Sequence, residues 1–488
     1  MVKLFIAGQD RSASSTSFDV ANPLTGKTVW TAPNATTADI DDAITDLAAF
    51  QPEWERVTPS QKRAVFLKAA ELVMTEKYHK LIVDCMTNET AASGGWQHVN
   101  QMASAAMLKE AAAQASQIRG EYHRSEKPDV NMFVVERRAA GVVFAIAPWN
   151  APVNLSIRAI GIPLICGNTV LLKASEYSPA SQRIVVDLLL EAGLPPRALA
   201  FVTMDREQAP ALTTHAIARR EVRRVNFTGS DIVGKIIASE CGKNLKQCIL
   251  ELGGKAPVIV SQNAKDNLES AAWGVVFGSL VHSGQVCMSS ERVLVHRSVY
   301  KEFEKLVSER VKKLRSGDPR EVQLGPLFRP SAAETVVKQI RDAVEKGADL
   351  LVGEVVDQAA GDYKTLLQPT VLSGISTKMD IWERESFGPV ICLTPFDDIE
   401  EAVKLANDSE YSLIAGLWTS DLHEAMKYAP QLRAGSVQVN GSTIHIEPTF
   451  GNAGLGGASG YGRFNVDSFT DLRSIAFHGH GGKFPMFG

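Results

Sequence analysis

The segment RRVNFTGSDIVGKIIASE, residues 223–240, runs from a strand-like stretch through a glycine turn into a helical stretch. Gly229 and Gly234 bracket the turn. A strand that leads directly into a helix is the building unit of parallel α/β structure, because parallel strands need a crossover helix to connect them. The segment therefore predicts an α/β fold.

The same unit recurs along the chain. Short β-branched runs alternate with longer amphipathic runs, such as residues 62–73 and 300–314. In the second of these, apolar side chains recur on one helical face: Phe303, Val307, Val311 and Leu314. The other predicted strands are VVFAIAPW (142–149), NTVLLKA (168–174), APVIV (256–260), GPVICLTPF (388–396) and SVQVNG (436–441). We therefore expect parallel sheets covered by helices.

Composition narrows the class of protein. The 488 residues are 45% hydrophobic and 22% charged, with a net charge of -4, which is ordinary for a globular chain of two or three domains. The mild acidity gives no general attraction to nucleic acid or to an anionic membrane. Apolar runs stay below the roughly 18 residues that cross a bilayer. Six cysteines show neither metal-ligand nor disulfide spacing. We expect a cytoplasmic protein with no metal and no nucleic-acid or membrane partner.

Cys287 lies in the segment SGQVCMSS (283–290), where its neighbours are small. A single cysteine is more often a buried structural thiol than a nucleophile. The small neighbours leave room around the sulfur, however, and the apolar run before them suits the lining of a pocket. Cys287 is therefore the candidate nucleophile.

Glu251 stands between two leucines in ILELGGKAP (249–257) and is followed by two glycines. Burying a carboxylate is costly unless it is paired, and a carboxylate held in apolar surroundings suits a general base. The alternative is a glutamate at a strand end that faces solvent.

Asn150 follows the predicted strand in FAIAPWNAPV (144–153), after a Pro-Trp turn. Ligands of open α/β sheets bind at the carboxyl ends of strands. An amide N–H in that place is able to stabilise an oxyanion, although asparagine is also a common turn residue.

Two segments indicate a nucleotide cofactor. The glycine turn of residues 223–240 places a helix N-terminus where a pyrophosphate would bind, although it lacks the G-x-G-x-x-G pattern. The strand NTVLLKA ends at Lys173, and Glu176 follows, so that the pair could bind ribose hydroxyls or be ordinary surface charges.

Together these segments resemble the aldehyde dehydrogenase superfamily over nearly the whole chain. Six motifs occur in the family's order: APWN (147–150), LLKASE (171–176), FTGS (227–230), LELGGK (250–255), GQVC (284–287) and ESFGP (385–389). Ala174 departs from the proline that the family often has in the second motif, which leaves the separation of Lys173 and Glu176 unchanged.

The resemblance implies a role for each motif. Cys287 is the nucleophile, Glu251 activates the thiol or the hydrolytic water, and Asn150 with the backbone N–H of Cys287 forms the oxyanion hole. NAD is the expected cofactor, and NADP is possible but less favoured, because Glu176 would repel a 2′-phosphate. The implied cofactor residues are Trp149, Lys173, Glu176, Gly229, Ser230, Gly234, Glu385 and Phe387.

The resemblance also implies a three-part architecture. A Rossmann-like NAD-binding domain comprises residues 1–120 and 141–252, and a catalytic domain comprises residues 253–433. A small bridging sheet, from residues 121–140 and 470–488, would join subunits into a homodimer or homotetramer. The bland alternative for those two segments is a surface hairpin and a frayed end.

The substrate is expected to be a small aldehyde, and an aromatic one. The helix APVNLSIRAIGIPL (151–164) lines the family's substrate tunnel. Its helical spacing projects four side chains toward that tunnel: Ala151, Asn154, Leu155 and Arg158. The small Ala151 would widen the tunnel for a ring. Arg158 needs a partner in this apolar helix, either a phenol oxygen of the substrate or an internal carboxylate. The chain most resembles dehydrogenases of the salicylaldehyde, vanillin and benzaldehyde type. The expected substrate residues are Trp96, Ala151, Leu155, Arg158 and Ile446.

Three alternatives remain open at this stage. An aliphatic aldehyde or semialdehyde dehydrogenase would use the same mechanism on another substrate. A cofactor-independent cysteine hydrolase would use Cys287 with a histidine partner, but no histidine stands in a recognisable motif. A binding protein that keeps the fold without catalysis would be expected to have lost Cys287 or Glu251, and both are present.

Overall fold

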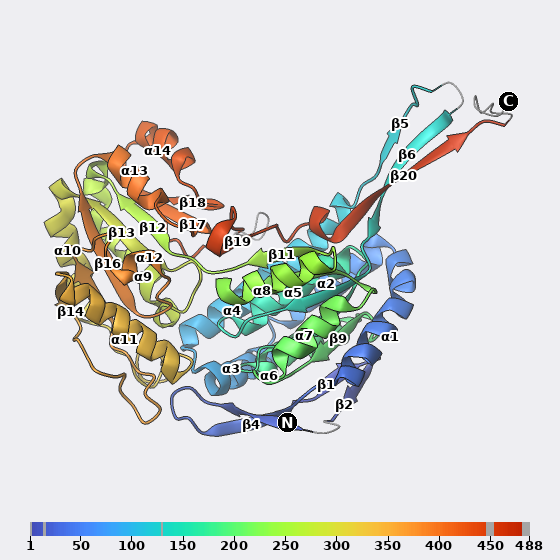
Figure 1. Cartoon of the computed structure of the whole chain (residues 1–488), viewed down its shortest axis with the longest axis horizontal. Coiled ribbons are helices and arrows are strands. Elements are labelled where there is room, and N and C mark those ends of the chain that lie inside the picture. The colour runs from blue at the N-terminus through green and yellow to red at the C-terminus, as the bar shows by residue number, and fades with distance from the viewer. Residues whose placement is uncertain (1, 13–15, 128–129, 446–452, 481–488) are drawn as a thin grey trace.

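The computed structural model describes residues 2–12, 16–127, 130–445 and 453–480, and two large sheets dominate it (Figure 1). The larger, eight-stranded sheet has the order β19-β11-β10-β7-β8-β9-β1-β2. Its strands are β1 (Leu4–Ile6), β2 (Gln9–Arg11), β7 (Val142–Ile146), β8 (Thr169–Lys173), β9 (Leu199–Val202), β10 (Val222–Thr228), β11 (Gln247–Glu251) and β19 (Gly460–Tyr461).

The five central strands of this sheet are parallel and alternate with helices. The crossover helices are α5 (Pro152–Ile165), α6 (Pro179–Ala192), α7 (Ala209–Ala218) and α8 (Asp231–Lys243). Further helices precede the parallel strands: α1 (Thr37–Arg56), α2 (Pro59–Leu72), α3 (Glu76–Thr90) and α4 (Gly94–Gln114). The predicted strand, turn and helix of residues 223–240 correspond to β10 and α8, and the predicted α/β class is confirmed.

The second sheet has seven strands in the order β14-β15-β16-β13-β12-β17-β18. All but β14 run parallel. The strands are β12 (Ala256–Val260), β13 (Ser290–His296), β14 (Asp349–Val352), β15 (Thr370–Ser373), β16 (Val390–Phe396), β17 (Ile414–Trp418) and β18 (Ser436–Val439). The helices around it are α9 (Leu268–Leu280), α10 (Arg297–Val311), α11 (Pro330–Glu345), α12 (Asp380–Glu383), α13 (Ile399–Asn407) and α14 (Leu422–Tyr428).

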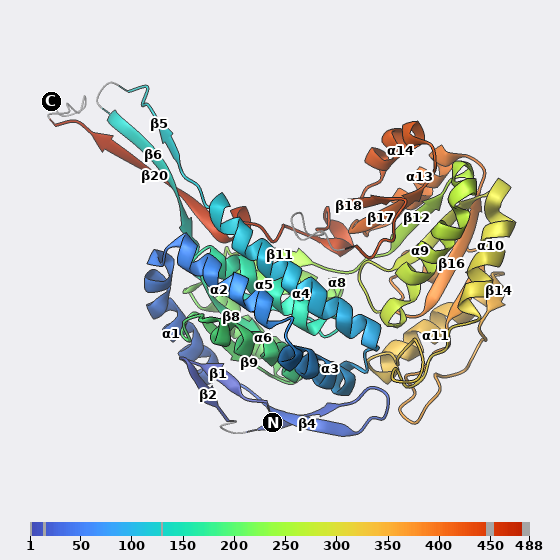
Figure 2. The same ribbon diagram turned by 180° about the vertical axis from the view of Figure 1, so that it is seen from behind.

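An antiparallel arm projects from the body of the molecule (Figures 1 and 2). It consists of β5 (Glu121–His123), β6 (Val130–Ala139) and β20 (Thr470–His478), with β6 in the middle. The hairpin predicted around residues 121–140 is thus present, and β20 pairs with β6 along its length, so that residues 470–478 do not form a free end. Residues 481–488 lie outside the described part. A separate ribbon joins β3 (Ser17–Ala21) and β4 (Thr28–Pro33).

The parallel strands are apolar because helices cover both faces of the sheet. In β7, Val143 and Ala145 face one apolar cluster, whereas Phe144 and Ile146 face the cluster on the opposite side. The strand predicted over 142–149 ends at Ile146, two residues before Pro148, and the one predicted over 388–396 begins at Val390, just after Pro389. Proline has no N–H for a ladder bond, which accounts for both shorter ends.

This topology gathers the motifs at one edge of the larger sheet. β7, β8, β10 and β11 are neighbours and parallel, so their carboxyl ends lie together. Asn150, Lys173, Gly229 and Glu251 all stand at or just after those ends. Across the described ranges, none of the helices combines the length and apolar character that spanning a membrane requires.

Candidate active site

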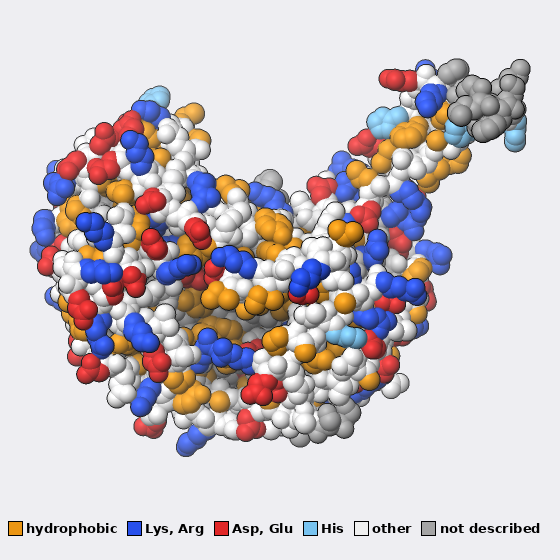
Figure 3. Space-filling view, viewed as in Figure 1, with side chains coloured by type: hydrophobic (Ala, Val, Ile, Leu, Met, Phe, Trp, Pro, Cys, Tyr) orange, Lys and Arg blue, Asp and Glu red, His pale blue; other side chains and the backbone are white. Residues whose placement is uncertain are grey.

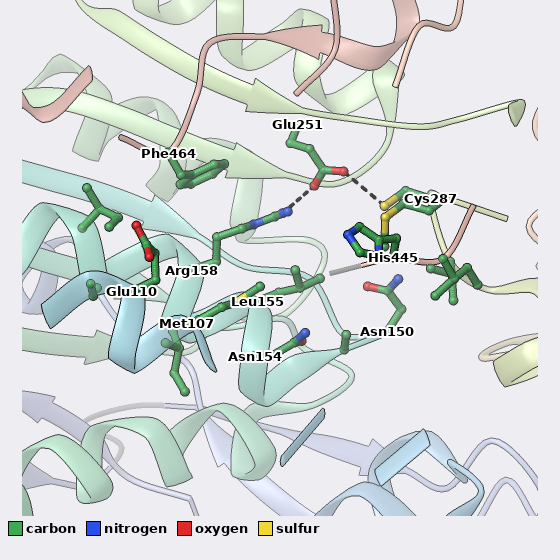
Figure 4. Close-up of a pocket in the computed structure, with 18 of the residues that line it drawn as sticks. Met107, Glu110, Asn150, Asn154, Leu155, Arg158, Glu251, Cys287, His445 and Phe464 are labelled. Atoms are coloured by element: carbon green, nitrogen blue, oxygen red, sulfur yellow. Dashed lines mark hydrogen bonds and ion pairs between the residues drawn. The ribbon is translucent and has the colours of Figure 1, made fainter. Parts of the chain in front are cut away.

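Cys287 lies on the loop between α9 and β13 and points toward the end of β11 (Figure 4). Its Sγ donates a hydrogen bond to Glu251 Oε1 over 3.1 Å. Two glycines make this approach possible. A Cβ on Gly254 would lie 2.0 Å from the carbonyl oxygen of Cys287. A Cβ on Gly284 would lie 2.1 Å from the carbonyl oxygen of Gly388, and the φ of Gly284 is +75°, which favours glycine. The loop therefore needs glycine at both positions.

The sulfur is a protonated thiol at rest. Burial raises the pKa of the Cys287 thiol well above its usual range, and the adjacent Glu251 carboxylate raises it further. A thiol must lose its proton before it attacks a carbonyl. Glu251 already accepts that proton's hydrogen bond, so it is the group placed to remove it.

Alkylation of the free enzyme should reveal this elevated pKa. Because only the thiolate reacts, the rate at which iodoacetamide modifies Cys287 should rise about tenfold per pH unit from pH 7 to pH 9, while pH stays below the pKa. Mass spectrometry of the peptide that contains Cys287 measures the rate, and the Cys287→Ala protein corrects for other cysteines. A rate that levels off below about pH 7.5 would contradict the raised pKa.

Glu251 is buried, with 2% of its side chain exposed, and it has two partners. Besides the thiol, Arg158 Nη2 donates to Glu251 Oε2 over 2.5 Å. The same Nη2 donates to Thr228 Oγ1 over 2.9 Å, and the guanidinium lies 4.9 Å from the centre of the Phe464 ring. Glu251 thus stands at a strand end but does not face solvent. Arg158 has the internal carboxylate partner, and it also lines the cavity at Cys287.

Replacing Arg158 should therefore impair Glu251 rather than the recognition of one substrate. We expect Arg158→Ala to lower kcat by about 10- to 100-fold, because the substitution removes the cation paired with the buried Glu251 carboxylate. The factor should be similar for benzaldehyde, salicylaldehyde and vanillin. Arg158→Lys, which keeps the charge, should recover part of the loss. Steady-state kinetics on the three aldehydes measures this, and a loss confined to the two phenolic aldehydes would assign Arg158 to substrate binding instead.

Asn150 is held by its surroundings with one amide proton to spare. Its Nδ2 donates to the carbonyl oxygen of Gln285 over 2.9 Å, and the backbone carbonyl of Asn150 accepts from Trp96 Nε1 over 2.8 Å. An amide carries two protons, and Asn150 lines the cavity beside Cys287. The second proton is therefore available to a substrate oxygen.

His282 is a buried neighbour that sequence reasoning did not single out. Its ring stacks on Trp96 with 5.4 Å between centres, and it lies 6.1 Å from the Trp149 ring. Burial lowers the pKa of His282 to about 3, so the ring is neutral and packs as an aromatic side chain. The hydrogen bond of the Cys287 thiol goes to the carboxylate of Glu251.

A cavity of about 100 Å³ ends at Cys287 and lies along α4 and α5 (Figure 4). The structure brings Trp96, Ala151, Leu155 and Arg158 together in its wall, as predicted, whereas Ile446 lies outside the described residues. Asn154, which was expected to project toward the tunnel from the same helix, also lines the cavity. Residues that the sequence reasoning missed line it as well: Met107, Glu110, Met288, Ile444, His445 and Phe464. The α4 residues follow Trp96 at helical spacing, a signal that could have found them, but nothing local marks Phe464.

A larger cleft opens on the other side of the strand ends, with a volume of about 560 Å³, and Figure 3 shows the hollow that it forms on this face. Lys173 lies 3.7 Å from Glu176 in its wall, and burial lowers the pKa of the Lys173 ammonium. Arg206 and Arg329, which were not predicted, add positive charge, and apolar residues of α7 and α8 complete the wall.

The residues of this cleft fit a dinucleotide. Gly229 and Ser230 stand at the N-terminus of α8, where backbone N–H groups are available to a pyrophosphate. A Cβ on Gly229 would lie 2.4 Å from the Phe227 ring, and a Cβ on Gly234 would lie 2.5 Å from the Leu252 side chain. Both distances are too short for a side chain, so the packing here favours glycine at both positions. The Trp149 ring stacks on Phe328, with 4.2 Å between centres, at the cleft wall.

Two predicted cofactor residues, Glu385 and Phe387, are not in the wall of this cleft but contact residues next to it. Glu385 Oε1 accepts a hydrogen bond from the Gly254 backbone N–H over 2.8 Å, and burial raises the pKa of its carboxyl well above the usual range. Phe387 has a left-handed backbone, with φ of +50°, and its ring meets that of Trp149 edge-on at 6.0 Å. The fold and site thus define an α/β protein in which a buried cysteine, hydrogen-bonded to a glutamate, lies beside a nucleotide-sized cleft.

Comparison with known proteins agrees with this class. A model of the aldehyde dehydrogenase family matches residues 10–475. Vanillin dehydrogenase of Pseudomonas sp. (strain HR199 / DSM 7063) is 38% identical, and salicylaldehyde dehydrogenase of Pseudomonas putida is 36% identical, each over 99% of both chains. The crystal structure of a salicylaldehyde dehydrogenase from Pseudomonas putida G7, complexed with salicylaldehyde, superposes with a TM-score of 0.94 at 34% identity and covers 99% of both chains.

The chain belongs to the aldehyde dehydrogenase family. It is an oxidoreductase that works with a nicotinamide dinucleotide, NAD or NADP. The predicted family, fold and enzyme class are thereby confirmed, and the cysteine-hydrolase and non-catalytic alternatives are set aside.

Proposed function

We propose that this enzyme oxidises aromatic aldehydes to carboxylic acids, with NAD, through a thioester on Cys287. The observation that carries the proposal is the cavity that ends at the sulfur. Trp96, Leu155 and Phe464 give it aromatic and aliphatic walls, and the side chain of Ala151 leaves space beside Asn150. Apolar walls of this kind stabilise a buried ring.

Size and charge favour a ring over the other aldehyde classes. The volume of about 100 Å³ is comparable with that of apolar cavities of about 150 Å³ that take up benzene. A semialdehyde would bring its own carboxylate into the cavity. There the charge of Arg158 is already paired with Glu251, and Glu110 adds a further negative charge. The relatives named for vanillin and salicylaldehyde support the same substrate class.

The first steps follow from the contacts at the sulfur. Glu251 accepts the thiol proton through the existing hydrogen bond, and the thiolate of Cys287 adds to the aldehyde carbon. The carbonyl π bond breaks and its oxygen becomes an oxyanion. The free amide proton of Asn150 and the backbone N–H of Cys287 stabilise that charge.

The remaining steps convert the adduct to the acid. When bound, the dinucleotide supplies the oxidant that accepts hydride. Cys287 then carries the acyl group as a thioester. Glu251, held by Arg158, passes the thiol proton to solvent and so regains its charge. It then deprotonates a water molecule that attacks the thioester carbon. Cleavage of the C–S bond releases the acid, and the Cys287 thiolate takes the water-derived proton from Glu251.

A screen of aldehydes tests the proposed substrate class. NAD reduction would be followed at 340 nm for benzaldehyde, salicylaldehyde, vanillin, acetaldehyde, hexanal and succinic semialdehyde. Burial of one ring contributes about 2–3 kcal/mol, so kcat/KM for the best aromatic aldehyde should exceed that for acetaldehyde by roughly 30- to 150-fold. If acetaldehyde or hexanal outperforms every aromatic aldehyde, the substrate proposal fails while the mechanism stands.

NAD should be preferred over NADP by about tenfold or more in kcat/KM. The Glu176 carboxylate lies in the cleft beside Lys173, where it is able to accept hydrogen bonds from ribose hydroxyls but would repel a 2′-phosphate. Glu176→Gln removes the negative charge and keeps the shape of the side chain. It should therefore raise kcat/KM for NADP and reduce the preference for NAD. Dinucleotide titrations with saturating benzaldehyde measure both ratios, and a parent enzyme that uses NADP as well as NAD would refute this role.

The domain division and the assembly belong to the same proposal. Residues 1–120 and 141–252 would bind the dinucleotide, residues 253–433 would carry the catalytic loop, and the arm with residues 470–488 would join subunits into a homodimer or homotetramer. The exposed apolar side chains of Leu472 and Phe477 on β20 support an arm that packs against another subunit.

We propose a cytoplasmic location, in keeping with six free cysteines.

A further inference from the structure

The side-chain amide of Asn154 lines the cavity at Cys287 but takes no part in the steps described above. Only 5% of the residue is exposed, and its Oδ1 is buried without a hydrogen-bond partner among the described residues. A buried polar atom is normally paired, because losing its hydrogen bond to water without replacement is costly. An orphaned amide in a substrate cavity therefore points to a partner that arrives with the substrate.

Helix geometry sets Asn154 beside the groups that act on the substrate. Asn154 and Arg158 are four residues apart on α5, so they share the face that lines the cavity, with Leu155 next to them (Figure 4). Arg158 Nη2 is already engaged by Glu251 and Thr228. Asn154 does not take part in these hydrogen bonds, so its replacement leaves the ion pair between Arg158 and Glu251 in place.

We propose that Asn154 recognises a hydroxyl group on the substrate ring, which makes hydroxylated aromatic aldehydes the preferred substrates. This inference rests on the proposed oxidation of aromatic aldehydes. An amide offers an acceptor on one side and donors on the other, and a hydroxyl group matches either side because it both donates and accepts. A methoxy group has no proton to donate to Oδ1. A carboxylate has none either, and it would also meet the negative charge of Glu110 in the same cavity.

Substituted benzaldehydes provide the test. kcat/KM would be measured with NAD for benzaldehyde, its 2-, 3- and 4-hydroxy derivatives, and the matching methoxy compounds. At least one hydroxy isomer should exceed both benzaldehyde and its own methoxy analogue by about tenfold, the effect of one hydrogen bond to a buried polar group. The best isomer also identifies the ring position that Asn154 reads.

Variants at neighbouring positions separate hydroxyl recognition from cavity shape. Asn154→Leu has nearly the same volume and no polar atom, so it should lose about tenfold more activity on the best hydroxy isomer than on benzaldehyde. Leu155→Ala, the matched control on the same helix face, should lower all the aromatic aldehydes by similar factors. Asn154→Ser keeps a donor and an acceptor, so it should retain part of the preference and serves if the leucine variant fails to fold.

A binding measurement gives a readout that is independent of turnover. In a Cys287→Ala background, calorimetry with the best hydroxybenzaldehyde and with benzaldehyde should show a ratio of Kd values of about ten, which Asn154→Leu reduces toward one. Equal Kd values for the hydroxybenzaldehyde and for benzaldehyde in the Cys287→Ala protein that retains Asn154 would overturn the inference.

The outcomes distinguish this inference from the function on which it rests. If benzaldehyde is a good substrate but hydroxyl groups bring no gain, or Asn154→Leu affects all rings equally, then Asn154 binds a structural water and the inference alone is overturned. If alkanals outperform every benzaldehyde, the proposed function fails and the inference fails with it.

Discussion

Replacing Cys287 with alanine is expected to lower kcat on every aldehyde by about 10⁴-fold or more, because the variant has no group to carry the acyl intermediate. The thiol lines the aldehyde cavity and donates a hydrogen bond to Glu251. The dinucleotide cleft lies on the other side of the strand ends and does not include Cys287 in its wall. NAD binding should therefore survive.

Two measurements check this result. Steady-state NAD reduction gives the loss of turnover, and fluorescence titration with NAD gives a Kd that should stay within about threefold of the parent value. Cys85→Ala is the matched control, since Cys85 is a half-buried free thiol on α3 that lines neither cavity. A Cys287→Ala enzyme with parental activity would eliminate the thioester mechanism.

Replacing Glu251 with glutamine should lower steady-state kcat by about 10²- to 10⁴-fold, the contribution of a general base. The amide is nearly isosteric with the carboxylate but cannot accept the thiol proton or activate water. It also leaves Arg158 without its charged partner. If water activation is the principal role, the acyl-enzyme forms faster than it hydrolyses, and a burst of NADH precedes a slow steady state.

Rapid mixing with benzaldehyde and NAD distinguishes the two roles of Glu251. A burst close to one equivalent per active site assigns Glu251 mainly to deacylation, whereas a slow reaction without a burst assigns it also to the activation of Cys287. Glu110→Gln is the matched control, because it removes a carboxylate from the same cavity at a residue that accepts a hydrogen bond from Gln114 Nε2. A Glu251→Gln enzyme with the parental steady-state rate would reduce Glu251 to a structural residue.

The sequence by itself determined the repeating strand and helix units and the order of the catalytic motifs. These are local features: the apolar runs of β7, β8 and β10, the glycine turn before α8, and the small residues around Cys287. Parallel topology then placed Asn150, Lys173 and Glu251 at one sheet edge, since neighbouring parallel strands end on the same side. Strand ends were less predictable, because Pro148 and Pro389 interrupt otherwise apolar runs.

Only the tertiary structure decided which side chains meet in the site. Arg158 and Glu251 are 93 positions apart, and the sequence left a phenol oxygen and an internal carboxylate equally open as partners of the guanidinium. Phe464 enters the cavity wall from a distant segment after the second sheet, and Phe328 reaches Trp149 across the cleft. Side-chain pairing depends on the distances and angles between whole elements, which local periodicity does not encode. The unpaired amide of Asn154 is visible for the same reason: a missing partner shows only when every neighbour is in place.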